Sequence, residues 1–216
     1  MINKIKPVRI AIAGLGFGEN VHIPASLFNE DIQLVGLWHP RAERLRESCA
    51  KHKLHAFENW EDLINNQDIE GIILATPPEP RYELAISAIK AGKHLLLEKP
   101  ACLNSDEVME LQINASKRNL KIAVDYEYRA VPLFMQAKRI IDQEKLHEPY
   151  FVKLDWLMSS RANPDRPWDW YSDKKAGGGV LGALGTHAFD MIHWLIGPTH
   201  SVSSINSTSI KERVCS

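Results

Sequence analysis

The sequence predicts an α/β fold, a doubly wound parallel sheet followed by a partial second domain of α/β or α+β type. Three observations predict it: short apolar runs alternate with amphipathic stretches from Val8 onwards, a glycine cluster follows the first run, and the alternation stops near Tyr126. Such alternation is typical of βαβ units. We therefore expect one domain over residues 1–125 and a second over residues 126–216.

Five apolar runs are the strands we expect in the first domain, and four amphipathic stretches are its helices. The strands are residues 8–13, 32–38, 70–76, 93–98 and 121–126. The helices are residues 41–53, 60–66, 81–92 and 105–119. Asn104 or Ser105 can cap the last helix, and Gly92 can end the one before it in a left-handed conformation. Several of the runs do not alternate polar and apolar residues, which suits strands covered on both faces.

The second domain contains fewer elements. The pattern predicts a helix over residues 132–146, a strand over residues 149–158 and an apolar helix over residues 180–197, with one further possible strand in the serine-rich stretch 199–216. So few strands make an incomplete sheet with an open edge. We expect that this C-terminal part is cut short.

Composition indicates a globular protein with small-molecule partners. The 216 residues are 44% hydrophobic and 25% charged, with a formal net charge of -1, so nothing in the charge balance suggests nucleic acid or a membrane surface. The 3 cysteines are widely spaced, which predicts neither disulfides nor a zinc site. No apolar run approaches the roughly 18 residues of a membrane span. A cytoplasmic location is the expectation.

The glycine cluster after the first strand is the first candidate site. Gly14 and Gly16 match the turn and close-approach glycines of the dinucleotide-binding Rossmann fingerprint. Glu19 occupies the place of the third glycine, and Gly18 one residue earlier can relax the same crossing. Glu19 must point away from a bound pyrophosphate. We expect coenzyme contacts from Gly14, Gly16, Phe17 and Gly18, the alternative being a glycine turn that binds nothing.

The end of the second strand favours NADP over NAD. A carboxylate that would hold the ribose diol of NAD is expected there, but the place falls on Trp38 or His39. His39, Arg41 and Arg44 instead offer an imidazole and two guanidiniums, which suit a ribose 2′-phosphate. Alternatively, Arg41 and Arg44 are only the solvated face of a helix.

Three segments together carry a resemblance to a known family. With "AIAGLGFG", "ILATPPEPRYELAISAIKAGKHLLLEKP" and "GGGVLGALGTHAFDMIHWLIG", the chain resembles the Gfo/Idh/MocA family of NAD(P)-dependent oxidoreductases over most of residues 8–197. The resemblance implies a second domain with a large open sheet that often mediates oligomers, so a homo-oligomer is expected. Family members are usually considerably longer than this chain.

The segment Glu98–Lys99–Pro100 is expected to carry a catalytic residue at the edge of the sheet. It follows a parallel strand at its carboxyl end, where ligands bind in open α/β sheets, and the proline favours an extended Lys99. By itself Lys99 could equally be a surface lysine. The resemblance implies that Glu98 and Lys99 contact the coenzyme and that the Lys99 amine exchanges a proton with a substrate hydroxyl.

The resemblance also implies a second catalytic residue, His187. The family pairs an aspartate with a histidine four residues later, and here the histidine matches while the aspartate position is Ala183. On its own, a histidine in an apolar helix is more often a core residue. We expect no metal on His187, Asp190 and His193, because steps of three wind around a helix rather than lining one face.

Softer matches complete the predicted site. By resemblance, Ala75, Thr76 and Pro77 lie against the coenzyme, and the histidine usually found a few residues later is Arg81. By the same analogy we expect substrate contacts from Tyr126, Arg129, Trp168 and Asp190. The segment 168–171, "WDWY", could stack on a sugar ring or could be a loop anchored on the core.

The function expected from these features is hydride transfer. It would run between the nicotinamide and a hydroxyl- or carbonyl-bearing carbon of a sugar, cyclitol or related polyol. Two alternatives stay open: a catalytically inactive NADP-binding sensor of the same fold, which the missing aspartate at Ala183 favours, and a truncated form that does not function.

Overall fold

The computed structural model describes residues 6–143, 149–159 and 162–214. The chain divides into two compact units, Met1–Asp125 and Tyr126–Ser216, and each is described by itself.

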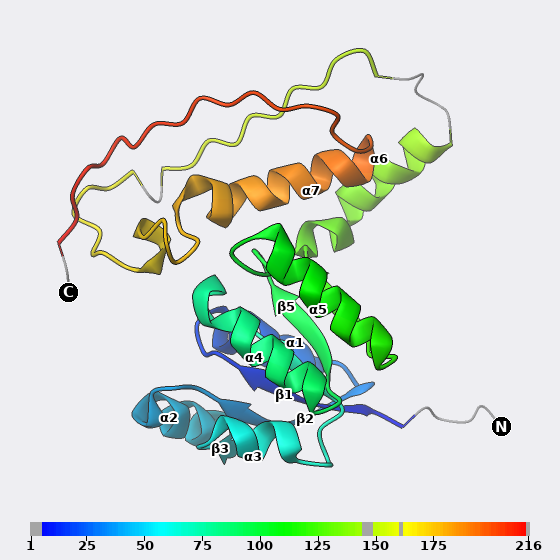
Figure 1. Cartoon of the computed structure of the whole chain (residues 1–216), viewed down its shortest axis with the longest axis vertical. Helices are drawn as coiled ribbons and strands as arrows, with labels where there is room; N and C mark the ends of the chain where they lie inside the picture. Colours follow the sequence, from blue (N-terminus) through cyan, green and yellow to red (C-terminus); the bar gives the residue numbers. More distant parts are fainter. Residues whose placement is uncertain (1–5, 144–148, 160–161, 215–216) are drawn as a thin grey trace. The chain divides into compact units, whose positions relative to one another are not determined.

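The first unit is built on a six-stranded parallel sheet (Figure 1). Its strands are β1 Val8–Ala13, β2 Ile32–Trp38, β3 His55–Phe57, β4 Gly71–Leu74, β5 His94–Glu98 and β6 Ile122–Asp125. They lie in the order β3-β2-β1-β4-β5-β6, so the strand order reverses between β1 and β4. The doubly wound fold class is confirmed, and each of the five predicted runs contains a strand. Sequence analysis missed only β3, which is three residues long.

Helices cover both faces of this sheet because neighbouring residues of each strand point to opposite sides. On one side Ile10 and Ile12 of β1 pack with α1 (Ile23–Phe28) and α2 (Ala42–His52). On the other side Ala11 and Ala13 pack in a cluster with buried residues of three further helices. These are α3 (Trp60–Asn65), α4 (Pro78–Lys90) and α5 (Ser105–Lys117).

The ends of two helices follow the predicted chemistry. Asn104 caps α5, since its side-chain oxygen accepts a hydrogen bond from the Glu107 amide at 2.9 Å. Gly92 follows α4 with a φ of 83°, a left-handed conformation that glycine adopts without strain. Local sequence signals therefore set where these helices begin and end.

The regular elements of the second unit's described part are all helical, and most of its other described residues have no regular structure. Its elements are η2 Glu127–Ala130, α6 Pro132–Asp142, η3 Trp170–Ser172, the π-helical turn η4 Leu181–Gly185 and α7 Thr186–Leu195. The helix predicted over residues 132–146 ends at Asp142, and residues 144–148 lie outside the described range. The helix predicted over residues 180–197 consists of η4 and α7.

The strand predicted over residues 149–158 is wrong, and the possible strand in residues 199–214 is also absent from the described chain. A strand needs a ladder of backbone hydrogen bonds from a neighbouring segment, and no such ladder joins the described part of either stretch. The Val214 carbonyl accepts a single such bond, from the Trp168 amide at 2.7 Å. Tyr150, Phe151 and Leu157 accordingly expose most of their surface. Among the described residues, no helix is both long and apolar enough for a membrane crossing.

We expect Gly36→Ala to destabilise the sheet, because an added Cβ on β2 would lie 2.6 Å from the His55 carbonyl oxygen and 2.7 Å from the Phe57 ring. Such overpacking should lower the free energy of unfolding in urea by about 1–3 kcal/mol. Gly71→Ala on β4 is the matched control, because its Cβ would meet no atom closer than 3.4 Å. Equal stability of the two variants would contradict the packing argument.

Candidate functional site

The loop after β1 is fixed by a crossing that admits no side chain. Gly14 has a φ of 100°, and a Cβ there would lie 2.6 Å from the Ala75 carbonyl and 2.7 Å from the Thr76 nitrogen. The Gly14 amide donates to the Trp38 carbonyl at 3.0 Å, and the Ala75 amide donates to the Ala13 carbonyl at 2.7 Å. The loop is therefore held between the carboxyl ends of β2 and β4, at the point where the strand order reverses.

The two other glycines of the cluster have different surroundings. A Cβ at Gly16 would meet no atom within 4 Å, so the backbone is open to a ligand there. A Cβ at Gly18 would lie 3.2 Å from the Ile12 side chain and 3.3 Å from the Ala75 Cβ. Gly18 thus allows the close helix–strand packing that the third glycine of the fingerprint provides. Phe17 between them is half-exposed and its ring meets the His22 ring edge-on at 5.5 Å.

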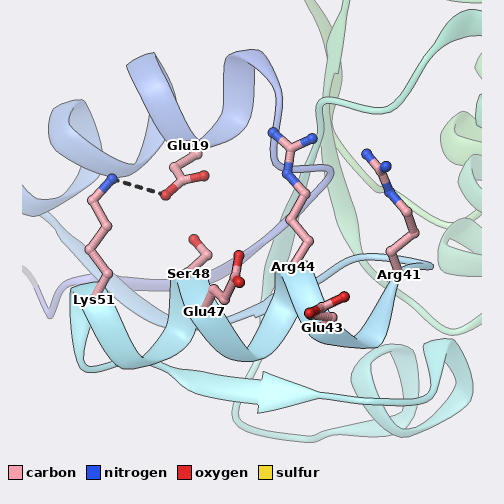
Figure 2. Close-up of a pocket in the computed structure, with 7 residues that line it drawn as sticks. All are labelled: Glu19, Arg41, Glu43, Arg44, Glu47, Ser48 and Lys51. Atoms are coloured by element: carbon pink, nitrogen blue, oxygen red, sulfur yellow. Dashed lines mark hydrogen bonds and ion pairs between the residues drawn. The ribbon is translucent and has the colours of Figure 1, made fainter. Parts of the chain in front are cut away.

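Glu19 turns its carboxylate toward α2 (Figure 2). It lies in the π-helical turn η1 (Gly18–His22), 3.1 Å from the Lys51 amine and 3.5 Å from the His52 ring nitrogen. Partial burial raises the pKa of Glu19, but the hydrogen bond and charge of Lys51, with the polar side chains of Ser48 and His52 nearby, outweigh it and hold the pKa below its ordinary value. These partners on α2 draw the Glu19 carboxylate away from the glycine loop, as a bound pyrophosphate would require.

A hollow of about 630 Å³ lies between η1 and α2. Its lining residues are Glu19, Arg41, Glu43, Arg44, Glu47, Ser48 and Lys51. Figure 2 shows Arg41 and Arg44 rising side by side from the start of α2. The Arg44 guanidinium donates to the Leu15 carbonyl at 2.6 Å, which ties α2 to the glycine loop. The predicted anion-binding guanidiniums therefore share one hollow beside that loop.

His39 contributes differently from the two arginines. Its Nδ1 accepts a hydrogen bond from the Arg41 amide at 3.0 Å. Burial lowers the pKa of His39, and the charges of Arg44 and Arg41 act in the same direction. His39 is therefore a neutral imidazole at neutral pH, and the positive charge of the predicted group comes from the guanidiniums.

A cluster of three titratable side chains, two of them buried, lies at the carboxyl ends of β5 and β6. Glu98 and Asp125 are register partners on these strands, and the His22 Nε2 lies 2.8 Å from a Glu98 oxygen and 3.8 Å from an Asp125 oxygen. These are ligand types that divalent cations accept. The separation of 2.8 Å between His22 and Glu98 is that of a hydrogen bond, and these two side chains bind each other. Sequence analysis missed His22 and Asp125, although acidic residues ending two neighbouring strands were a usable signal.

Arg81 connects this edge to the loop after β4. Its buried guanidinium donates to the carbonyl oxygens of Glu98, Pro100 and Thr76. The predicted coenzyme loop, residues 75–77, and the predicted catalytic segment, residues 98–100, are thus joined by one side chain. The Lys99–Pro100 peptide bond is cis.

In the second unit His187 is enclosed by aromatic rings. The Tyr128 ring lies 4.6 Å from it edge-on, the Tyr126 ring lies at 5.9 Å, and the Trp156 ring is stacked at 6.1 Å. The His187 Nε2 is 3.6 Å from a Glu127 carboxylate oxygen. Ala183 is buried in η4 one turn before it. This environment suits a packed core histidine and equally a histidine whose ring is fixed for proton handling.

The predicted substrate residues Arg129 and Asp190 bind each other. The guanidinium makes two hydrogen bonds to the carboxylate, at 2.8 Å and 2.5 Å, and this contact raises the pKa of Arg129. His193 hydrogen-bonds Thr199 at 2.8 Å. In the segment 168–171, Trp170 and Tyr171 stack on each other at 3.8 Å, whereas Trp168 is half-exposed. Only Trp168 of this segment thus offers an exposed indole.

The sequence-predicted residues are therefore distributed over both units. The first unit brings together the glycine loop, the Arg41 hollow and the edge that carries Lys99. The second unit brings together Tyr126 and His187, and separately Arg129 and Asp190. Each group is ordered by contacts within its own unit.

Comparison with known proteins gives matches along the whole chain. Residues 8–126 match the model of the Gfo/Idh/MocA oxidoreductase family with an NAD-binding Rossmann fold, and residues 134–214 match a C-terminal domain of that family. An uncharacterized oxidoreductase of Synechocystis sp. is 38% identical over 98% of this chain and 57% of its own length. The scyllo-inositol 2-dehydrogenase (NADP(+)) of Bacillus subtilis is 24% identical over 93% of this chain and 55% of its own.

Levoglucosan dehydrogenases are found among both the similar sequences and the similar solved structures. Levoglucosan dehydrogenase of Pseudarthrobacter phenanthrenivorans is 33% identical over 73% of this chain and 42% of its own length. A levoglucosan dehydrogenase structure in complex with NADH and levoglucosan superimposes with a TM-score of 0.83 and 25% identity, over 97% of this chain and 60% of that chain. The chain spans about half the length of the curated relatives it matches.

The lowered pKa of Glu19 predicts a pH dependence of stability. The carboxylate's contribution is complete above its unfolded pKa, near 4.5, and is lost as pH falls through the lower folded-state value. Glu19→Gln should unfold more easily than the unmodified chain at neutral pH, and the two urea midpoints should converge as the solution is acidified. Glu47→Gln, at an exposed position of α2, is the control. A constant gap between the chain and Glu19→Gln would be inconsistent with the ion pair.

Proposed function

The chain belongs to the Gfo/Idh/MocA family of oxidoreductases with an NAD-binding Rossmann fold, and on that premise we propose that it binds NADP and transfers a hydride to or from a polyol. The substrate class we propose is a sugar, cyclitol or related polyol with a hydroxyl or carbonyl at the reacting carbon. The printed names of two relatives support this class, since one acts on levoglucosan and the other on scyllo-inositol.

The observation that carries the proposal is the open backbone at Gly16. Gly14 fixes the turn, Gly18 brings the following helix close, and Glu19 is engaged by Lys51, so the space at Gly16 stays available for a diphosphate. Backbone amides at a glycine turn that opens a helix are a favourable environment for phosphate. Phe17, Ala75, Thr76 and Pro77 border the same loop and are proposed as further coenzyme contacts.

The choice of NADP rests on the hollow that holds Arg41 and Arg44. A ribose 2′-phosphate carries about two negative charges, and paired guanidiniums can bind it with charge-assisted hydrogen bonds. Arg44 is partly committed to the Leu15 carbonyl, which leaves Arg41 as the more available partner. His39, neutral at neutral pH, would contact the ribose or adenine rather than neutralise charge.

The proposed chemistry divides between coenzyme and protein. When bound, the nicotinamide supplies or accepts the hydride. Lys99 would hold the substrate oxygen and exchange its proton at Nζ, while Glu98 keeps the lysine segment in place through its bond to His22. His187 is proposed as a proton-handling residue on the strength of its fixed ring. Tyr126, Trp168 and the Arg129–Asp190 pair are proposed to contact substrate, and a cytoplasmic homo-oligomer remains our prediction.

One observation favours a second function, that of an NADP-binding sensor without turnover. Ala183 stands where the resemblance leads us to expect a catalytic aspartate, and its buried methyl group can exchange no proton. Lys99 and His187 argue for the enzyme, because a sensor does not need either group. The two functions differ in whether any polyol reduces the bound coenzyme.

Arg41→Ser tests the coenzyme preference. Loss of one charge-assisted contact should raise the dissociation constant for NADPH about tenfold or more and leave that for NADH nearly unchanged. Fluorescence titration of each nucleotide measures both constants. Arg46→Ser is the matched control, because Arg46 lies on the same helix, is exposed and pairs with Glu58 instead. Equal affinities of the unmodified chain for NADPH and NADH would remove the 2′-phosphate argument.

Lys99→Ala tests the catalytic assignment. We expect turnover with a panel of sugars and cyclitols, levoglucosan and scyllo-inositol among them, to fall by about 100-fold or more, because a general acid–base group is lost. The dissociation constant for NADPH should change little. Lys117→Ala, at an exposed position of α5, should retain full activity. A chain whose melting temperature rises with NADPH, but which oxidises nothing in the panel when NADP+ is supplied as the hydride acceptor, would instead be the sensor.

A further inference from the structure

Arg81 is a fully buried charged side chain in the first unit, with only 2% of its surface exposed. It lies in the first turn of α4. A guanidinium is costly to bury unless its donors are satisfied, so the acceptors that surround Arg81 help to keep it buried. The carbonyl groups to which Arg81 donates therefore show which segments it holds together.

The three carbonyl partners of Arg81 all lie at the edge where the strands end. One nitrogen, Nη1, donates to both Glu98 and Pro100, the residues immediately before and after Lys99. The other, Nη2, donates to Thr76 in the loop after β4. The planar, fixed geometry of the guanidinium allows one group to hold both loops at a set separation.

A second contact holds the same segment from its other side. The Glu98 carboxylate is hydrogen-bonded to His22 at 2.8 Å, and both side chains are buried. Glu98 is thus anchored by its carbonyl to α4 and by its side chain to η1. The backbone on either side of Lys99 therefore has little freedom, whereas the Lys99 side chain is only partly buried.

We propose that Arg81 is a positioning residue that sets the place of the Lys99 amine relative to the coenzyme loop, an inference that rests on the proposed function. The guanidinium acts through backbone carbonyls rather than by touching a reacting atom. Because it bridges the Thr76 loop and the Lys99 segment, removing it should alter coenzyme binding and the environment of Lys99 together.

Lys93 provides a built-in comparison for a purely structural role. It is also buried, and its amine donates to the carbonyls of Asn66 and Ile69 at 2.7 Å each. These residues precede β4, and Lys93 itself precedes β5, so this tether joins the same two strands at their amino ends. Lys93 thus makes the same kind of contact at the sheet edge opposite to Lys99.

The test compares Arg81→Met, Arg81→Lys and Lys93→Met in the full chain. Two quantities are measured: the dissociation constant for NADPH, and the rate at which an amine-reactive acetylating reagent labels Lys99 in the absence of nucleotide. Peptide mass spectrometry reports the labelling of Lys99 relative to the exposed Lys117 in the same sample. Melting temperatures record the loss of stability in each variant.

We expect both methionine variants to lose stability, but only Arg81→Met to raise the dissociation constant about tenfold and to change the Lys99 labelling ratio about threefold or more. Arg81→Lys keeps a charge and one donor group, so its values should be intermediate. If Arg81→Met fails to fold, the proposal is tested by comparing the dissociation constant and the Lys99 labelling ratio of Arg81→Lys with those of Lys93→Met.

An unchanged Lys99 labelling ratio in the Arg81 variants would overturn the proposal, and so would an equal change in Lys93→Met. Failure of the proposed function is separate from this result. If the unmodified chain binds neither NADPH nor NADH, the labelling ratio without nucleotide still shows whether Arg81 positions Lys99.

Discussion

The candidate site depends on one crossing at which no side chain fits, the contact of Gly14 with the backbone of Ala75 and Thr76. This contact lets the chain turn sharply out of β1 at the point where the strand order reverses. Ala75 also supports Gly18, so the same short loop sets the start of the following helix. The open space at Gly16 follows from that placement, whereas the direction of Glu19 is set by its ion pair with Lys51.

Besides the Gly14 crossing, buried polar groups hold the strand ends and the Lys99 segment. Strand ends expose carbonyl groups that must be satisfied, and in this unit two buried cations satisfy several of them, Lys93 at the amino ends and Arg81 at the carboxyl ends. His22 adds a bond to the Glu98 side chain. The segment that carries Lys99 is thereby held more tightly than a loop normally is, which the proton exchange that we propose for Lys99 would require.

The first unit was more predictable than the second, for a physical reason. Its strands are parallel and most of them lie inside the sheet, so apolar runs and glycine turns mark them within the local sequence. Residues 149–158 show an equally apolar pattern, but a strand needs a neighbour, and no described segment supplies one. The pairing of Arg129 with Asp190, which we propose as a substrate contact, could not be predicted either, because the two residues lie 61 positions apart in the sequence.

The sequence by itself determined the doubly wound fold, the glycine loop, the arginines that follow the second strand and the position of Lys99 at a strand end. Each of these features follows from a local sequence pattern, that is, from residues that are neighbours in the chain. Only the tertiary structure decided that Glu19 turns to Lys51, that His22 meets Glu98 and that Arg81 joins two loops. These contacts link residues that are distant in sequence, and no local pattern encodes which buried donor will find which acceptor.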